Sequence, residues 1–241
     1  MYTFSSSYSG LQPIEEIAKT PLLPPGTMVQ AYDPVWGLGE FVYGRASAAI
    51  RSGALCVLNI VFNATLDEYS YSFAEAPNTA NTGFPLYVRI GQPMVTDDYG
   101  WFASSVFCPL LCNASLTNGT PIGIVAAGQA GANTAGKQIV GARVHQAGTQ
   151  ALVKTGCRGE PNANTIRSPD TAGWFVGGYL SGTGVGAGAV ITSIGPGDLV
   201  GVSVANTAAG VAGSVTQTAN NGTVFYNLVS LRQPVMQSAI T

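Results

Sequence analysis

Short runs of β-branched and aromatic residues, each ended by Gly, Asn or Pro, follow one another along this chain from Gly26 almost to its last residue. Such residues favour extended strands, and the residues between the runs favour turns. The expected strands are residues 27–32, 39–46, 54–62, 69–76, 85–90, 100–107, 121–128, 137–145, 151–156, 173–180, 189–194, 199–205 and 223–231. No window of about a dozen residues repeats apolar positions at helical spacing with caps at its ends. The sequence therefore predicts an all-β fold, an antiparallel β-sandwich or barrel.

Residues 1–26 differ from the rest of the chain because they are rich in Ser, Tyr and Pro. The three prolines within residues 21–25 restrict the backbone to extended conformations. Residues 13–19 begin with Pro and carry two Glu in what would be a first helical turn, which favours one or two turns of helix there. We expect residues 1–26 to be an extended Pro-rich arm that lies on the surface.

The remainder is expected to divide into two β-rich parts. Residues 27–149 contain most of the large apolar residues and should form the main domain, whereas residues 150–241 are dominated by Gly, Ala and other small residues. The last strand, about residues 224–236, is expected to return to the main domain. Whether residues 150–223 form a separate protruding domain is left open.

Four glycines on alternate positions, Gly182, Gly184, Gly186 and Gly188, stand out within the second part. In a strand they would share one face and allow another backbone to approach closely. In a loop they would provide only conformational freedom, and the sequence does not separate the two interpretations.

The surface of this chain should be polar but almost uncharged, because charged residues make up 9% of it, compared with about 25% in an average soluble domain. Charged side chains are costly to desolvate and are depleted in the cores of interfaces. The composition therefore favours a protein that neighbouring subunits cover. The alternative is a β-protein that works alone behind a surface of Thr and Asn.

The charge pattern argues against several classes of partner. The 10 basic and 12 acidic residues give a net charge of −2, and the nearest approach to a basic cluster is the thin scatter of Lys154, Arg158 and Arg167. Because phosphate binding needs clustered cations, no nucleic-acid partner is expected. No apolar run reaches the roughly 18 residues of a membrane span. The first ten residues lack the pattern of a secretion signal, so we expect synthesis in the cytoplasm.

No motif in the sequence carries chemistry. Residues 131–138, GANTAGKQ, match Gly-x-x-x-x-Gly-Lys, but Gln138 replaces the Ser or Thr that would hold magnesium, and a strand-like run follows instead of a helix. We interpret this segment as a turn between strands. His145 is the only histidine, and a Cys–His couple with Cys157 would have to be formed by folding. We therefore expect no enzymatic activity, no cofactor and no metal site.

The cysteines are too few for a disulfide scaffold and are spaced differently from zinc-binding pairs. We expect free, buried thiols at all positions, which are Cys56, Cys108, Cys112 and Cys157.

The segment AYDPVWGLGEFVYGRASAAIRSGALCVLN, residues 31–59, resembles a segment of the capsid decoration, or cement, proteins of tailed bacteriophages. The matching positions are Gly26, Thr27, Val29, Asp33, Pro34, Gly37, Gly39, Glu40, Phe41 and Tyr43. Residues 98–102 (DYGWF), 136–144 (GKQIVGARV) and 227–236 (NLVSLRQPVM) also look similar. The resemblance covers residues 26–149 and the last strand, and leaves the Gly/Ala-rich block unmatched.

This resemblance implies a non-enzymatic structural protein of the virion. It would bind the major capsid protein on the outer surface of the phage head through residues 27–149, as a homotrimer, and would stabilise the capsid lattice. The turn at Asp33–Pro34 would position aromatic residues, and the expected core or interface anchors are Trp36, Phe41, Tyr43 and Trp101. The alternative is a spike or fibre domain that binds a cell-surface carbohydrate through aromatic, Asn and Thr side chains.

Overall fold

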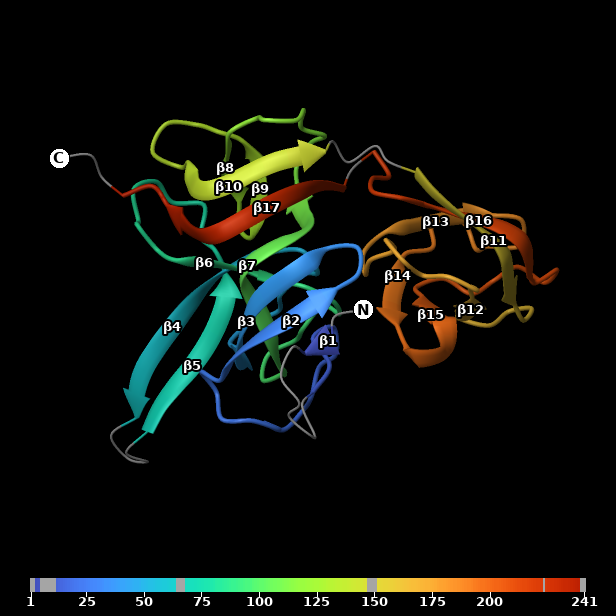
Figure 1. The fold of residues 1–241 in the computed structure, drawn as a ribbon, viewed down its shortest axis with the longest axis horizontal. Coiled ribbons are helices and arrows are strands. Elements are labelled where there is room, and N and C mark those ends of the chain that lie inside the picture. Colours follow the sequence, from blue (N-terminus) through green and yellow to red (C-terminus); the bar gives the residue numbers. More distant parts are fainter. Residues whose placement is uncertain (1–2, 5–11, 64–67, 147–150, 223, 239–241) are drawn as a thin grey trace.

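The computed structural model describes residues 3–4, 12–63, 68–146, 151–222 and 224–238, and these are arranged in two β-sheets that lie side by side (Figure 1). The predicted all-β fold is confirmed, with sheets that pack as a sandwich or barrel. Most of the expected strands are present, and four further strands, over residues 3–4, 129–132, 165–167 and 211–218, were not predicted.

The first sheet has the order β1-β2-β3-β5-β4-β6-β7-β17-β10, with β9 bonded to β7 and β8 bonded to β9. Its strands are β1 (Thr3–Phe4), β2 (Met28–Asp33), β3 (Gly37–Ala46), β4 (Leu55–Asn63), β5 (Glu68–Glu75), β6 (Leu86–Arg89), β7 (Tyr99–Cys112), β8 (Ile122–Ala126), β9 (Gln129–Ala132), β10 (Ile139–Gln146) and β17 (Phe225–Met236). A further pairing of β3 with β7 closes β3, β5, β4, β6 and β7 into a ring.

Closure of this ring buries β3 and β7 on both faces. Phe41 and Tyr43 face one hydrophobic cluster, while Val42 between them faces a second cluster inside the ring. On β7, Trp101 likewise belongs to the first cluster, and Phe102 belongs to the cluster inside the ring. Successive residues of a strand point to opposite faces, so a strand with two buried faces loses the apolar/polar alternation of a half-exposed strand.

The second sheet has the order β13-β16-β11-β12-β15-β14. Its strands are β11 (Ala151–Gly159), β12 (Thr165–Arg167), β13 (Tyr179–Gly182), β14 (Ile191–Ile194), β15 (Leu199–Val202) and β16 (Val211–Thr218), with a short 3₁₀ turn, η1 (Pro196–Asp198). Tyr179 of β13 forms an isolated antiparallel bridge with Val190, which immediately precedes β14, so the two edges of the sheet meet. The sheet therefore curls around its own core. After it, β17 returns to lie between β7 and β10 of the first sheet.

Residues 12–18 are buried or partly buried, which differs from the expected surface arm. Ile14 is completely buried and Gln12 nearly so. The Trp101 Nε1–H donates to the Gln12 carbonyl at 2.8 Å, and the Tyr43 hydroxyl donates to Gln12 Oε1 at 2.9 Å. Apolar burial of Ile14 and these bonds hold the segment against β3 and β7, so the prediction is wrong here. Residues 1–2 and 5–11 of the expected arm lie outside the described residues.

The helix expected over residues 13–19 is also absent, and a turn occupies its place. The carbonyl groups of Ile14, Glu15 and Glu16 accept hydrogen bonds from the Arg89 guanidinium. Bonds to Arg89 replace the helical bonds that the sequence pattern suggested.

The alternating glycines do not share a strand face, because Gly182 ends β13 and the other three lie in the turns and connecting residues that follow. Gly184 and Gly188 have positive φ angles of 82° and 73°. A Cβ atom at Gly184 would lie 1.7 Å from the carbonyl oxygen of Gly210. The loop interpretation is therefore correct, and Gly184 also permits close approach of a second backbone segment.

Candidate functional site

The expected aromatic anchors fall into two groups. Phe41, Tyr43 and Trp101 are completely buried in the core of the first sheet, where the Tyr43 and Trp101 rings meet edge to face with centroids 5.0 Å apart. Trp36 is only partly buried and contacts Phe107, with ring centroids 5.9 Å apart. Of the four residues, Trp36 is the one whose side chain reaches the surface.

The position of Trp36 follows from the turn between β2 and β3. Asp33 Oδ1 accepts hydrogen bonds from the backbone N–H groups of Val35 at 2.7 Å and Trp36 at 2.9 Å. Gly37 follows with a φ of 78°, which an L-residue rarely adopts. The Asp-Pro segment with its glycine is therefore a turn that holds Trp36 in place, as the sequence suggested.

A cleft of about 350 Å³ separates this turn from residues 169–176, which precede β13. Its apolar walls include three aromatic side chains, and its polar walls include four carboxylates. These residues are Trp36, Trp174, Phe175, Glu15, Asp33, Asp170 and Asp198. The volume lies within the range of small-ligand sites, which are about 300–1,000 Å³.

Two of these carboxylates already accept hydrogen bonds from other groups of the protein. Asp33 is engaged by its turn, and Asp170 forms an ion pair with Lys154 and accepts a hydrogen bond from the Ala172 N–H. The bond from Lys154 is the main reason that the pKa of Asp170 is lowered. An acid held in its ionised form by these donors serves as an acceptor rather than as a proton donor.

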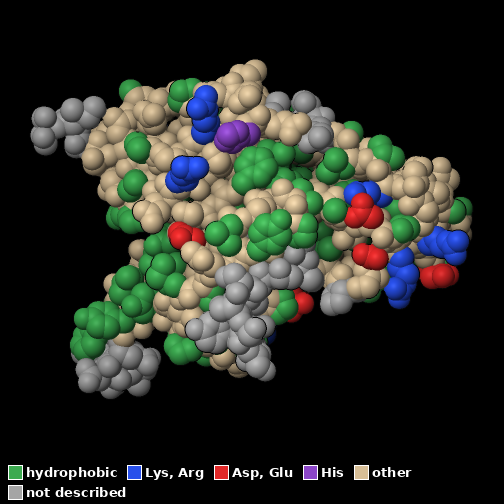
Figure 2. Space-filling model, viewed as in Figure 1, with side chains coloured by type: hydrophobic (Ala, Val, Ile, Leu, Met, Phe, Trp, Pro, Cys, Tyr) green, Lys and Arg blue, Asp and Glu red, His purple; other side chains and the backbone are tan. Residues whose placement is uncertain are grey.

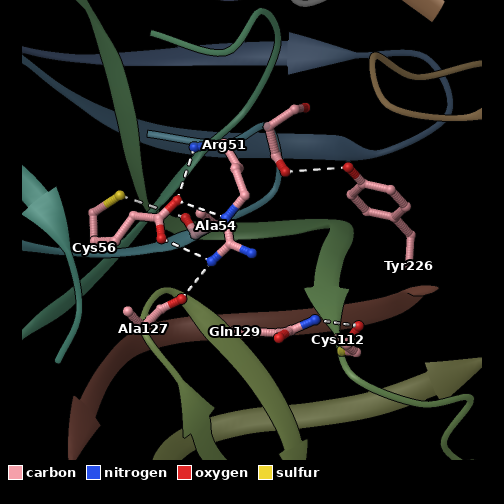
Figure 3. A network of polar contacts seen from close by, with 9 residues as sticks. Arg51, Ala54, Cys56, Cys112, Ala127, Gln129 and Tyr226 are labelled. Atoms are coloured by element: carbon pink, nitrogen blue, oxygen red, sulfur yellow. Dashed lines mark hydrogen bonds and ion pairs between the residues drawn. The ribbon is translucent and has the colours of Figure 1, made fainter. Parts of the chain in front are cut away.

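A network of polar contacts surrounds residues 51 and 52, which precede β4 (Figure 3). Ser52 donates its hydroxyl to the Val176 carbonyl at 2.8 Å, and the Tyr226 hydroxyl donates to the Ser52 carbonyl at 3.3 Å. Arg51 binds Glu75 through two nitrogens, Nε at 2.9 Å and Nη2 at 2.7 Å. The bond with Glu75 raises the pKa of Arg51. Each of these polar side chains is paired with another protein group, so the network stabilises the loops that it connects.

The other candidate nucleophiles and bases are separated or buried. His145 lies on β10, where Nε2 is 2.9 Å from Ser230 Oγ, whereas Cys157 lies in the core of the second sheet. The structure therefore does not bring the Cys–His couple together. All four cysteines are free and buried, as predicted. Burial raises the pKa of Cys112 to about 11, so this thiol stays protonated near neutral pH.

The segment that resembles a phosphate-binding loop is a turn that leads into β10, as the sequence suggested. Among the described residues, no three His, Cys, Asp or Glu side chains are grouped so that they could hold a metal ion. The described part of the chain also contains no helix with the length and hydropathy needed to cross a membrane.

The β4–β5 hairpin is the surface that sequence reasoning missed. It projects from the first sheet, and Figure 2 shows hydrophobic side chains along it. Ile60, Val61, Phe62 and Tyr69 are 52%, 58%, 48% and 61% exposed. The sequence predicts one strand over residues 54–62, but only its first half is buried, and a single sequence does not indicate where a strand leaves its sheet.

Comparisons of this chain with family models, curated proteins and solved structures find no match.

Proposed function

We propose that this protein is a non-enzymatic structural component of a phage particle, which binds the outer surface of the head and stabilises the capsid lattice. The observation that carries the proposal is the exposed apolar β4–β5 hairpin. The proposal also rests on the resemblance of residues 31–59 to capsid decoration proteins.

One face of this hairpin is a continuous apolar strip. Phe62 pairs with Tyr69, and Ile60 pairs with Tyr71 in the antiparallel register, so these side chains share a face. The Phe62 and Tyr69 ring centroids are 5.1 Å apart. The strip continues toward Leu58, which packs against the core inside the ring. Because a two-stranded ribbon alone is marginally stable, an apolar partner surface would stabilise this one.

We propose that the major capsid protein covers this strip. Exposed apolar patches mark interaction sites in soluble proteins, and a desolvated contact needs few charges. Lys and Arg are absent from residues 52–88, so no basic side chain of β4 or β5 would have to be desolvated. Attachment through this hairpin leaves the rest of the first sheet free for contacts between copies of the chain in a homotrimer.

Stabilisation of the lattice then follows from linkage. A protein that binds only the expanded capsid shifts the equilibrium of the shell toward that state. The test is to add the purified protein to expanded heads that lack it, sediment the heads and follow their thermal disruption. We expect the protein to sediment with the heads and to raise the disruption temperature. Protein that stays in the supernatant and leaves this temperature unchanged would contradict the proposal.

A further inference from the structure

Two arginines face each other on the second sheet. Arg158 on β11 and Arg167 on β12 are direct partners in the antiparallel register, and both are exposed. Direct partners carry their side chains on the same face, with Cβ atoms about 5 Å apart. The sequence separates these residues, and the short strand β12, which brings them together, was not predicted.

Among the described residues, the two guanidinium groups have no counter-ion within ion-pair distance, and neither forms a side-chain hydrogen bond. Like charges directly opposite each other destabilise a sheet. Two adjacent guanidinium forks also match the geometry of a carboxylate or phosphate group, so an anion bound between them would remove the repulsion.

The arginine pair borders a hollow of about 370 Å³. Gly156 and Gly197, which have no side chains to fill it, form part of the wall, and Asp198 is the one carboxylate among its lining residues. Asp198 disfavours a simple polyanion such as phosphate through charge repulsion. It can, however, accept hydrogen bonds from hydroxyl groups.

The hollow adjoins the aromatic cleft described above, because Pro169 and Asp198 line both. The cleft offers the Trp36 and Trp174 side chains. Aromatic walls beside a carboxylate that accepts from hydroxyls, and a cationic pair that receives a carboxylate, together match the chemistry of an acidic sugar ring.

We propose that these two hollows form a binding site for an acidic sugar of the uronic-acid class. The sugar carboxylate binds Arg158 and Arg167, its hydroxyl groups donate to Asp198, and its ring or the next ring of the chain contacts the aromatic cleft. This site does not include the β4–β5 hairpin. The proposed sugar binding and the proposed attachment to a head can therefore be tested separately.

The experiment is an NMR titration of the full chain, labelled with ¹⁵N, in which the arginine Nε–Hε signals are followed as glucuronate is added. Glucose, acetate and inorganic phosphate are titrated in parallel. We expect glucuronate to shift the signals of Arg158 and Arg167 and to bind more tightly than each of the other three compounds.

Substitutions separate this site from a general charge effect. The double variant R158Q/R167Q should weaken glucuronate binding by about tenfold or more, because charge-assisted hydrogen bonds are lost. The matched control is R143Q, since Arg143 is also an exposed strand arginine but stands opposite Ser230. It should bind glucuronate as the unmodified chain does. Equal binding of acetate, phosphate and glucuronate, or equal loss in R143Q, would overturn the proposal.

Discussion

Arg89 Nη1 donates a hydrogen bond to the carbonyl oxygen of Ile14, 75 residues earlier in the chain, at 3.2 Å. Arg89 is completely buried. Its remaining N–H groups donate to the carbonyls of Gln92 at 2.9 Å, Trp101 at 3.0 Å, and Glu15 and Glu16, both at 3.1 Å. A single side chain thus fixes the N-terminal segment to β6 and β7, and burial lowers its pKa to about 10.

Substitution of Arg89 by lysine should therefore destabilise the protein. Lysine offers three donors instead of five and lacks the planar fork, so buried carbonyl groups lose their partners. We expect R89K to lower the free energy of unfolding by about 3 kcal/mol, measured by urea denaturation. R143K at the exposed Arg143 should change it by less than about 0.5 kcal/mol. Similar values for the two variants would show that Arg89 does not hold the segment.

Two glycines allow a matched test of the contact between the sheets. Gly177 has a φ of 99°, and a Cβ there would lie 2.4 Å from the Tyr226 hydroxyl oxygen. Gly188 has a φ of 73° and no atom within 4 Å of its Cβ position. G188A should cost only the backbone strain of about 1 kcal/mol. G177A should cost about 1–3 kcal/mol more because the side chain also overlaps Tyr226. Equal melting temperatures would mean that Tyr226 moves freely away.

Stability should fall as the pH rises from 9 to 10. Burial is the largest cause of the raised pKa values of Cys56, Cys108 and Cys112. In this window the unfolded thiols lose protons while the folded ones keep them, so folding is penalised as pH rises. Each thiol contributes up to about 1.4 kcal/mol per pH unit. Arg89, with its pKa lowered to about 10, opposes the trend only at higher pH.

The measurement is the free energy of unfolding in urea at several pH values, under reducing conditions. C112A should lose stability at every pH because a cavity forms, but its slope between pH 9 and 10 should be shallower. A slope of zero or of opposite sign in the unmodified chain would contradict the thiol assignment.

The strands could be predicted because strand preference depends on residues that are adjacent in the sequence. The order of the strands in the sheets could not be predicted. The predicted strand at 100–107 is rich in aromatic residues and lies within the long strand β7. By contrast, β16 has the sequence VAGSVTQT, whose small and polar residues give little strand signal. Residues 173–178 gave a false strand signal from Trp174 and Phe175, because positive φ angles at Gly173 and Gly177 turn the chain there.

The candidate sites were less predictable than the fold. The sequence suggested the turn that holds Trp36, since an Asp-Pro pair with a following glycine has a local conformation. It gave no means to decide whether an aromatic residue such as Tyr43 lies in the core, because this depends on which strands cover it. The pairing of Arg158 with Arg167 depends on strand register, which forms only when the sheet closes.

Self-association is testable by light scattering after size exclusion. Three chains of 24.7 kDa would have a mass of about 74 kDa. We expect that mass, because a surface with few charges has a low desolvation cost when copies associate. A mass near that of a single chain would contradict a preassembled trimer. A trimer would then have to form on the head.

Binding of hairpin variants to expanded heads tests the central claim most directly. The double variant I60T/F62T replaces two apolar side chains of the exposed strip, and V153T is the matched control, since Val153 is 57% exposed on β11 of the other sheet. We expect I60T/F62T to bind the heads at least about tenfold more weakly than the unmodified chain, and V153T to bind equally well. Unchanged binding of I60T/F62T would contradict attachment through the β4–β5 hairpin.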